Sequence, residues 1–368
     1  MKQYFALGSY TEPILFGTGE VFHGKGKGIS ICSFEDGRIE LCRELPVRNP
    51  SFLCISEPDK RIYAVNEMKE YQGKTGGGLT EISYDEEGNM KTEGSWNVEG
   101  TDPCHVAVSP DKSFLSVANF ANGSVTVFAL NEDGSVKEKS QYIQHHGSSV
   151  HPVRQKGPHA HSSLFAPGED MMYVPDLGMD RVVAYRYENG RIWPDPEADI
   201  VVPAGGGPRF GEFSQDGKHF YLINEIGSQV MHFRCQRNAA ENGAGSACGM
   251  MTMADSVSTL PDGYDGGNIC SDLHLTPDGR FLLASNRGHD SLACYRIQAD
   301  GSLSFVERVS SGGRTPRNFA VDPSGAYVLV GNQDSDNITV FRLDPEGHLS
   351  QVSQMTAGSP VCIRFFGL

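Results

Sequence analysis

The chain alternates apolar and polar residues in short runs that tight turns separate. Residues 207–225, GPRFGEFSQDGKHFYLINE, show the pattern: an alternating run, a turn at Gln-Asp-Gly, a more apolar run and a final Asn-Glu. A period of two is typical of a β-strand, and Asp and Gly suit the turn between two strands. The stretch therefore predicts a β-hairpin that brings Arg209 and Glu225 to the same end.

This hairpin pattern recurs along the whole chain. Six copies cover residues 49–67, 102–120, 158–177, 207–225, 269–287 and 315–333. A second hairpin follows several of them, at 124–136, 181–193, 291–306 and 337–352. An Asn or Asp marks positions 66, 119, 176, 224, 286 and 332, so the spacing runs from 46 to 62 residues. Four strands in a unit of that length predict the blades of a β-propeller.

A seventh unit is split between the two ends of the chain. Residues 359–366 match the first strand of the repeat, and residues 4–11 match the second. Pairing the two ends in one blade closes the ring and removes two free sheet edges. We therefore predict an all-β, seven-bladed propeller with four antiparallel strands per blade, forming a single domain over residues 1–368.

Two positions of each hairpin are expected to surround the central channel on one face of the disc. They are the residue after the Pro position of the first strand and the residue after the Asn position of the second. The ionisable residues at these positions are Glu67, His161, Arg209, Glu225, Arg287 and Arg317. They concentrate on neighbouring blades, although charges at these positions do nothing for the fold of a hairpin.

This set of side chains suits an anionic ligand. The planar guanidinium group binds carboxylate or phosphate through two parallel hydrogen bonds, and a histidine can move a proton near neutral pH. The alternative is that Arg209–Glu225 and Arg287–Glu67 are only salt bridges at the channel mouth. The clustering of the charges favours a functional site.

Composition excludes some classes of protein. The net charge of −15 argues against nucleic-acid binding, which needs a basic face. No apolar run is long enough to span a membrane. The start of the chain lacks the apolar segment of a secretory signal, and nine scattered cysteines without a CxxC pair indicate reduced thiols, so we expect a cytoplasmic protein.

Three segments stand outside the repeat: a histidine-rich tract, a Gly-rich connector and an insertion. The tract 144–162 holds five histidines, but their spacing fits no common zinc site, so no metal or other cofactor is expected. His159 should point the same way as His161. The loop that contains Arg154 should lean over the mouth of the channel. The Gly-rich connector within 12–28 lacks a phosphate-loop pattern and is expected to be flexible, with Lys25 and Lys27 near the rim. Residues 241–256 are expected to form an irregular insertion.

The runs GPHAHS, GGPRF with INE, LTPDGRFLLASNR and TPRNFAVDPSG resemble the seven-bladed lactonase propellers. That family includes bacterial 6-phosphogluconolactonases and fungal carboxy-muconate lactonising enzymes. The resemblance spans nearly the whole chain and implies functional roles for His161, Glu225, Arg209 and Arg287, with Arg317 nearby. Glu67, His159 and Arg154 are added as candidate substrate-binding residues.

Three functions follow from this reading. The favoured one is a metal-independent lactonase that hydrolyses a sugar-acid lactone, with 6-phosphogluconolactone as the leading substrate. The alternatives are a cycloisomerase acting on an unsaturated dicarboxylate and a propeller that only binds a ligand or protein. The sequence leaves open whether Glu225 or His161 is the base, which lactone is the true substrate, and the oligomeric state.

Overall fold

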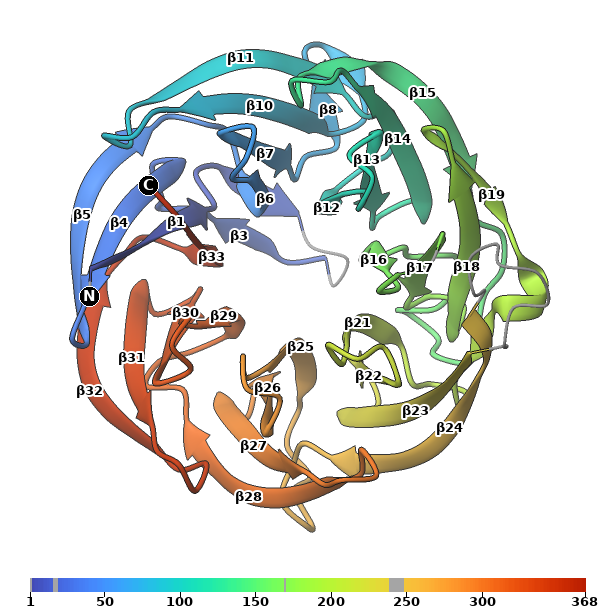
Figure 1. The fold of residues 1–368 in the computed structure, drawn as a ribbon, viewed down its shortest axis with the longest axis vertical. Helices are drawn as coiled ribbons and strands as arrows, with labels where there is room; N and C mark the ends of the chain where they lie inside the picture. Colours follow the sequence, from blue (N-terminus) through green and yellow to red (C-terminus); the bar gives the residue numbers. More distant parts are fainter. Residues whose placement is uncertain (1, 16–18, 169, 238–247) are drawn as a thin grey trace.

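The computed structural model describes residues 2–15, 19–168, 170–237 and 248–368. Its sheets form a ring around a central axis, with both chain ends in the same blade (Figure 1). Each of the seven blades is a sheet with four antiparallel strands in radial order, and one of these sheets carries an extra short strand. The seven-bladed propeller predicted from the repeats is confirmed.

Blades one to three cover the first part of the chain. Blade one consists of β33 (Pro360–Phe366), β1 (Gln3–Ser9), β4 (Ile29–Glu35) and β5 (Arg38–Leu45). Blade two consists of β6 (Pro50–Ser56), β7 (Arg61–Asn66), β10 (Gly78–Tyr84) and β11 (Met90–Asn97). Blade three consists of β12 (Pro103–Val108), β13 (Phe114–Asn119), β14 (Ser124–Leu130) and β15 (Val136–Gln144). The pairing of β33 with β1 closes the ring as the split repeat predicts.

Blades four to seven complete the ring. Blade four consists of β16 (Leu164–Phe165), β17 (Met171–Asp176), β18 (Arg181–Glu188) and β19 (Arg191–Pro194), with β20 (Ile200–Val201) also paired to β18 and a 3₁₀ helix at Pro196–Ala198. Blade five consists of β21 (Pro208–Phe213), β22 (His219–Asn224), β23 (Gln229–Arg237) and β24 (Cys248–Ser258). Blade six consists of β25 (Ile269–Leu275), β26 (Phe281–Arg287), β27 (Ser291–Ile297) and β28 (Leu303–Ser310). Blade seven consists of β29 (Pro316–Val321), β30 (Tyr327–Asn332), β31 (Asn337–Leu343) and β32 (Leu349–Thr356).

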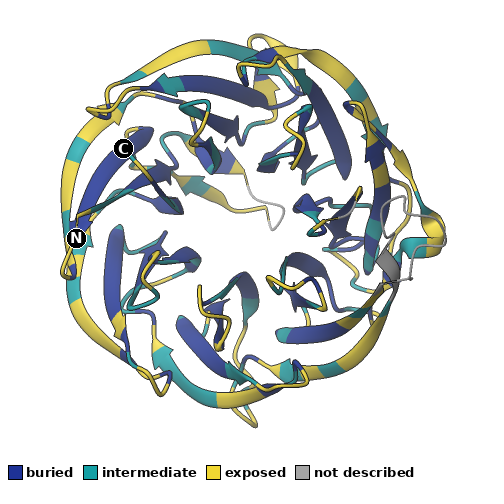
Figure 2. Cartoon of the chain, in the orientation of Figure 1, coloured by how far each residue is buried: buried dark blue, intermediate teal, exposed yellow. Residues whose placement is uncertain are grey.

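The hydrophobic core lies between neighbouring blades. Large side chains such as Tyr63, Phe128, Phe220 and Tyr295 are fully buried there. Figure 2 shows the buried residues on the inner strands and the exposed residues on the outermost strand of each blade. The apolar faces of neighbouring sheets pack against each other and exclude water from the space between the blades. The outer strands alternate between side chains that face this core and side chains that face solvent.

The repeated asparagine joins the second strand of a blade to its surroundings. In blade three the Asn119 amide donates to the hydroxyl oxygens of Ser124 and Thr126, at 3.1 and 3.0 Å. In blade seven the Asn332 amide donates to the Ser311 carbonyl oxygen and to the Thr339 hydroxyl, at 3.2 and 3.1 Å. These bonds fix the end of the second strand, directly before the residue that faces the channel.

Two segments differ from the sequence-based expectations. The connector after β1 is not simply flexible, because β2 (Pro13–Leu15) and β3 (Val21–His23) pair into a small hairpin. The prediction of an irregular insertion is wrong for residues 248–256, because they belong to β24, which pairs along its length with β23. The preceding residues, 238–247, lie outside the described part of the chain.

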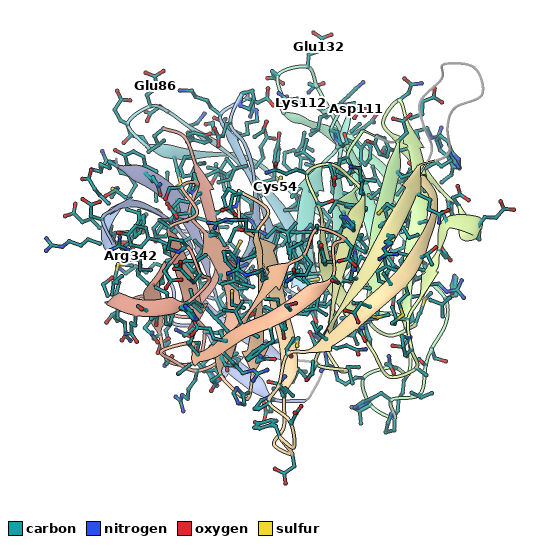
Figure 3. All side chains as sticks on the ribbon, turned by 60° about the horizontal axis from the view of Figure 1, so that its bottom comes forward. Cys54, Glu86, Asp111, Lys112, Glu132 and Arg342 are labelled. Carbon is teal, nitrogen blue, oxygen red and sulfur yellow. The ribbon has the colours of Figure 1, made fainter. Side chains whose placement is uncertain are left out.

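The two faces of the disc differ. The turns that join first to second strands and third to fourth strands lie on one face, and Figure 3 shows Glu86, Lys112 and Glu132 of such turns along one edge of the tilted disc. The opposite face holds the starts of the first strands and the ends of the second strands, and with them the predicted site. A further short hairpin there joins β8 (Glu70–Tyr71) to β9 (Lys74–Thr75). In the described part of the chain no helix has the length and apolarity to cross a membrane.

Candidate active site

A cavity of about 640 Å³ opens at the end of the central channel. Its wall contains five of the seven residues that follow the Asn position of a second strand: Glu67, Phe120, Glu225, Arg287 and Gln333. Its floor contains Cys104, His161 and Arg317, which follow the Pro position of a first strand. The two sequence positions predicted to surround the channel therefore supply successive levels of one cavity.

A β-bulge aims the floor residues at the axis. In blade three, Pro103 pairs with Asn119 and His105 pairs with Ala118, so Cys104 has no partner on the neighbouring strand. The same shift leaves Arg209 unpaired between β21 and β22, and Arg317 unpaired between β29 and β30. A bulge bends its strand and turns the extra side chain away from the sheet, which explains how these residues leave the regular alternation.

Blade four reaches the same result with a shorter first strand. β16 spans only two residues, and His161 joins the blade through a hydrogen bond from its backbone amide to the Pro175 carbonyl oxygen, at 2.9 Å. The next residues bond to neighbouring blades instead: the Ser162 hydroxyl donates to the Arg209 carbonyl oxygen at 3.0 Å, and the Ser163 amide donates to His105 Nδ1 at 3.3 Å. These contacts hold His161 at the floor of the cavity.

Three guanidinium groups close on the carboxylate of Glu225. Arg209 Nε and Arg287 donate to Oε2, at 2.9 and 2.7 Å, and Arg154 donates to Oε1 at 2.5 Å. Only 2% of Glu225 is exposed. Burial by itself would raise the pKa of this carboxyl group, but the charges of Arg287, Arg154 and Arg209 outweigh it and hold the pKa well below its usual value. Glu225 is therefore a fixed anion.

A second cluster lies across the cavity. Glu67 Oε2 accepts a hydrogen bond of 2.7 Å from the Tyr10 hydroxyl and one of 3.3 Å from Arg317. The Arg317 guanidinium also lies over the Tyr10 ring, 5.3 Å from its centroid, in a cation–π contact. Tyr10 is fully buried, and burial raises the pKa of its hydroxyl well above the usual value. Tyr10 therefore remains a neutral hydrogen-bond donor that orients Glu67.

His161 is uncharged in this setting. Burial lowers the pKa of its imidazole well below the ordinary value, and the Arg209 charge acts in the same direction. Its Nδ1 lies 3.8 Å from Cys104 Sγ, and its ring packs edge-on against Phe120. Among the described residues none forms a hydrogen bond with His161 Nε2, so this nitrogen is available to a ligand in the cavity.

The inner part of the site carries an excess of positive charge. Four guanidinium groups, those of Arg154, Arg209, Arg287 and Arg317, face two carboxylates, those of Glu67 and Glu225, which leaves two positive charges. Buried like charges repel each other, and an anion that lies among them offsets this repulsion. The arrangement therefore suits a ligand that is anionic or that becomes anionic during a reaction.

The predicted residues do not all reach the cavity. Arg209 lies beneath the floor, where it also donates to the Ser271 carbonyl oxygen, so it supports Glu225 from below. His159 lies outside the cavity lining, stacked behind Phe120 with ring centroids 4.7 Å apart. The alternative pairing of Arg287 with Glu67 is wrong, because Arg287 binds Glu225 and Arg317 binds Glu67.

One histidine of the tract, His151, helps to position Arg154. His151 Nδ1 accepts hydrogen bonds from the backbone amides of Val153 and Arg154, at 3.2 and 3.1 Å. The side-chain amide of Gln155 donates to the Leu177 carbonyl oxygen at 2.8 Å and to the Asp180 carboxylate at 2.7 Å. The loop is therefore fixed, and Arg154 leans over the cavity as the sequence predicts. The described residues contain no group of three or more His, Cys, Asp or Glu side chains placed to hold a metal ion.

Sequence reasoning missed the contribution of the β2–β3 hairpin. Figure 1 shows β3 reaching inward from blade one, and Leu15, Glu20, Val21 and Phe22 line the cavity. The expected rim lysines point elsewhere, because they pair with acidic residues outside the cavity lining: Lys25 with Asp336 and Lys27 with Glu44. The available signal was two short segments with apolar residues, PILF and EVFH, on either side of the sequence GTG.

The fold and the cavity together define a seven-bladed propeller with a charged pocket on its axis. A family model described as lactonase, 7-bladed beta-propeller, matches residues 4–365, so the chain belongs to this lactonase family. A 6-phosphogluconolactonase of Bacillus subtilis is 31% identical over 265 residues, which are 72% of this chain and 71% of that protein. A 6-phosphogluconolactonase of Formosa agariphila is 33% identical over 293 residues, or 76% and 78% of the two chains.

Solved structures agree with this assignment. The periplasmic gluconolactonase of Pseudomonas aeruginosa superposes with a TM-score of 0.87 at 33% identity, covering 99% of both chains. A putative 6-phosphogluconolactonase of Bacteroides fragilis gives a TM-score of 0.86 at 29% identity, covering 99% of this chain and 98% of that one. These proteins share the whole ring with this chain.

Proposed function

We propose that this protein hydrolyses the lactone of a sugar acid without a metal ion, with 6-phosphogluconolactone as its substrate. The observation that carries the proposal is the uncharged His161 at the floor of a cavity whose wall gathers guanidinium groups around a buried carboxylate. Membership of the lactonase family and the names of two relatives, both 6-phosphogluconolactonases, support the same reaction and substrate.

His161 acts as the general base in this proposal. Its neutral Nε2 accepts a proton from a water molecule whose oxygen attacks the lactone carbonyl carbon. The ring C–O bond then breaks, and the proton passes from His161 to the leaving ring oxygen, which becomes a hydroxyl group. The product is a hydroxy acid that ionises to a carboxylate and releases one proton to solvent.

Glu225 is better suited to positioning than to proton transfer. Both of its oxygens accept hydrogen bonds from guanidinium groups, so neither is free to receive a proton from water. Its role is to hold Arg287 and Arg154 at the cavity wall and Arg209 beneath the floor. These contacts favour His161 over Glu225 as the base, a choice that the sequence leaves open.

Arginines stabilise the charge that forms during the reaction. Arg287 and Arg317 belong to the two clusters that face each other across the cavity, and their fixed positive charge stabilises the oxyanion of the tetrahedral intermediate. The same groups offer partners to the substrate phosphate and to the product carboxylate. Glu67 Oε1, opposite, is an acceptor for a substrate hydroxyl.

The test is the hydrolysis of 6-phosphogluconolactone by purified protein in the presence of a chelator. Proton release is followed in weak buffer near pH 6.5, and the spontaneous rate is subtracted. We expect catalytic turnover that the chelator leaves unchanged. A rate equal to that of buffer, or full loss with chelator and recovery with metal, would overturn the proposal. A conjugated dicarboxylate, monitored by absorbance, is the parallel assay for the cycloisomerase alternative.

The proposal also places the enzyme in the cytoplasm. Eight cysteines are free thiols, which a reducing compartment maintains: Cys32, Cys42, Cys54, Cys104, Cys235, Cys270, Cys294 and Cys362. The periplasmic neighbour shows that a related propeller also works outside the cytoplasm. Separation of cytoplasmic and periplasmic fractions, with an antibody against the native protein, decides between the two locations.

A further inference from the structure

A buried carboxylate of blade four joins two segments that carry active-site residues. Asp180 lies in the turn between β17 and β18 and is only 3% exposed. Its Oδ1 accepts hydrogen bonds from the Gln155 side chain and from the Gly207 backbone amide, both at 2.7 Å. Its Oδ2 accepts hydrogen bonds from the Ser149 hydroxyl at 2.5 Å and from the Gly205 backbone amide at 2.6 Å. Each oxygen thus accepts two bonds from uncharged donors, which a carboxylate can do and a side-chain amide of the same shape cannot.

One of these bonds belongs to the repeat. Asp336 occupies the same turn in blade seven, four residues after the Asn position, and both aspartates have a left-handed backbone: φ is 50° at Asp180 and 52° at Asp336. Asp336 accepts a hydrogen bond of 2.9 Å from the backbone amide of Ser359, directly before the proline that begins the first strand of the next blade. Gly207 makes the corresponding bond to Asp180, directly before the proline of β21. This contact, the blade latch, joins consecutive blades whether or not they carry a site residue.

The bonds to Ser149 and Gln155 are an addition in blade four. In blade seven the other oxygen of Asp336 binds an exposed lysine at 2.6 Å, whereas in blade four Asp180 holds a whole loop. The Ser149 backbone amide donates to the Gln155 carbonyl oxygen at 2.9 Å, so the two ends of the loop meet. Because both ends bind one carboxylate, the residue directly before Gln155, which is Arg154, is held in a fixed place.

We infer that Asp180 is a positioning residue of the active site: by fixing the loop that carries Arg154, it holds this arginine against Glu225. It acts on both members of the pair, because the Glu225 backbone amide donates to the Gly207 carbonyl oxygen at 2.7 Å and Gly207 binds Asp180. Asp180 is not among the residues that line the cavity, so it acts on the reaction through the residues it holds. A guanidinium group that is fixed before the reaction stabilises developing negative charge without the cost of reorganisation. The inference rests on the proposed function and adds to it a residue outside the cavity.

The kinetic experiment separates the loop bonds from the blade latch. Gln155→Met removes a loop bond and keeps the latch, whereas Asp180→Gly removes all four bonds and suits the left-handed φ. The matched control is Asp336→Gly, which removes the same latch at nearly the same φ in blade seven. With 6-phosphogluconolactone and the full-length protein, we expect kcat/KM to fall roughly tenfold in the first two variants, because a misplacement of about 1 Å costs up to about 100-fold. The control, which lies far from Arg154 in the ring, should stay within about twofold of the wild type.

A double-mutant cycle with Arg154→Met tests whether the effect passes through Arg154. If it does, Gln155→Met lowers kcat/KM by less than about twofold once Arg154 is replaced, because the two changes then remove the same contact. Full multiplication of the two single losses would overturn the inference, and so would an unchanged kcat/KM in Gln155→Met. Unfolding midpoints of all variants are measured in parallel. Losses of kcat/KM that follow the midpoint in every variant, Asp336→Gly included, would leave Asp180 a structural role only and overturn the inference.

Limited proteolysis gives a readout that does not depend on activity. Trypsin cleaves after arginine and lysine, and Arg154 and Lys156 lie in and directly beside the loop. Cleavage of a native protein requires local opening, so release of the loop from Asp180 raises its rate. We expect Asp180→Gly to be cut at these two positions at least about tenfold faster than the wild type and Asp336→Gly. Equal rates in the three proteins would overturn the inference. If the wild type hydrolyses no lactone, the proposed function fails, and the cleavage rates still decide whether Asp180 positions Arg154.

Discussion

Replacing Glu225 with Gln should destabilise the fold as well as the site, because the carboxylate neutralises three buried or half-buried guanidinium groups. The nearest oxygen–nitrogen distances are 2.5, 2.7 and 2.9 Å. At an effective dielectric constant near 20, one pair of unit charges 4 Å apart interacts by about 4 kcal/mol. Removing the charge loses three such attractions and leaves three like charges together.

The net loss is smaller than the sum of these terms. The glutamine avoids the desolvation penalty of a buried carboxylate, and breaking a buried ion pair usually costs about 3–5 kcal/mol. We therefore expect Glu225→Gln to lower the free energy of unfolding by about 4 kcal/mol. Urea unfolding at low salt measures the loss, with Glu138→Gln, on the exposed face of β15, as the matched control.

A second arm of this experiment uses inorganic phosphate. If the guanidinium groups repel one another in the variant, phosphate should bind among them and raise the unfolding midpoint of Glu225→Gln more than that of the wild type. A loss below about 1 kcal/mol, the value typical of an exposed salt bridge, would refute the reasoning. An equal response of both proteins to phosphate would also count against it.

Three further predictions concern pH and geometry. Because burial and Arg209 lower the pKa of His161 and a general base must be deprotonated, kcat/KM should hold down to pH 6.5 and fall only below it; a fall centred above pH 6.5 contradicts this. His274 is held between Asp272 and Glu212, whose charges outweigh burial and raise its pKa to about 10, so its stabilisation is complete below pH 6.5 and is lost as the pH rises towards 10. Urea unfolding should show this alkaline loss, up to about 5 kcal/mol, reduced in His274→Gln; identical pH profiles of the two proteins would disprove it. Arg209→Lys should lower kcat by roughly tenfold, because lysine lacks the fork that spans a carboxylate and a carbonyl; unchanged steady-state kinetics would refute that role.

The sequence predicts the ring well because its strands are local and repetitive. Alternation with a period of two, turn residues at fixed places and an Asn at the end of each second strand appear in nearly every unit. The same regularity places His161, Glu225, Arg287 and Arg317 around one axis without any coordinates. The position of a residue in the repeat is enough to predict that it lies at the channel axis.

Long side chains and short hairpins were harder to predict. Strand register places Arg287 and Arg317 on the channel. Because a long guanidinium side chain can reach several partners, the register does not determine which glutamate each arginine binds. The β-bulge that turns Arg209 beneath the floor carries no residue signal beyond the preceding proline. The β2–β3 hairpin has two strands of three residues, which are too short to show a pattern with a period of two beside the surrounding glycines.

The most direct test of the central claim is the kcat of His161→Gln on 6-phosphogluconolactone, compared with that of the wild type. The unfolding midpoints of both proteins are measured as well, so that a loss of kcat is not due to a loss of fold. Loss of the imidazole that receives the proton should lower kcat by at least about 100-fold, since general-base catalysis contributes roughly 10²–10⁴-fold. A variant that folds normally and keeps kcat within about threefold of the wild type would contradict the account.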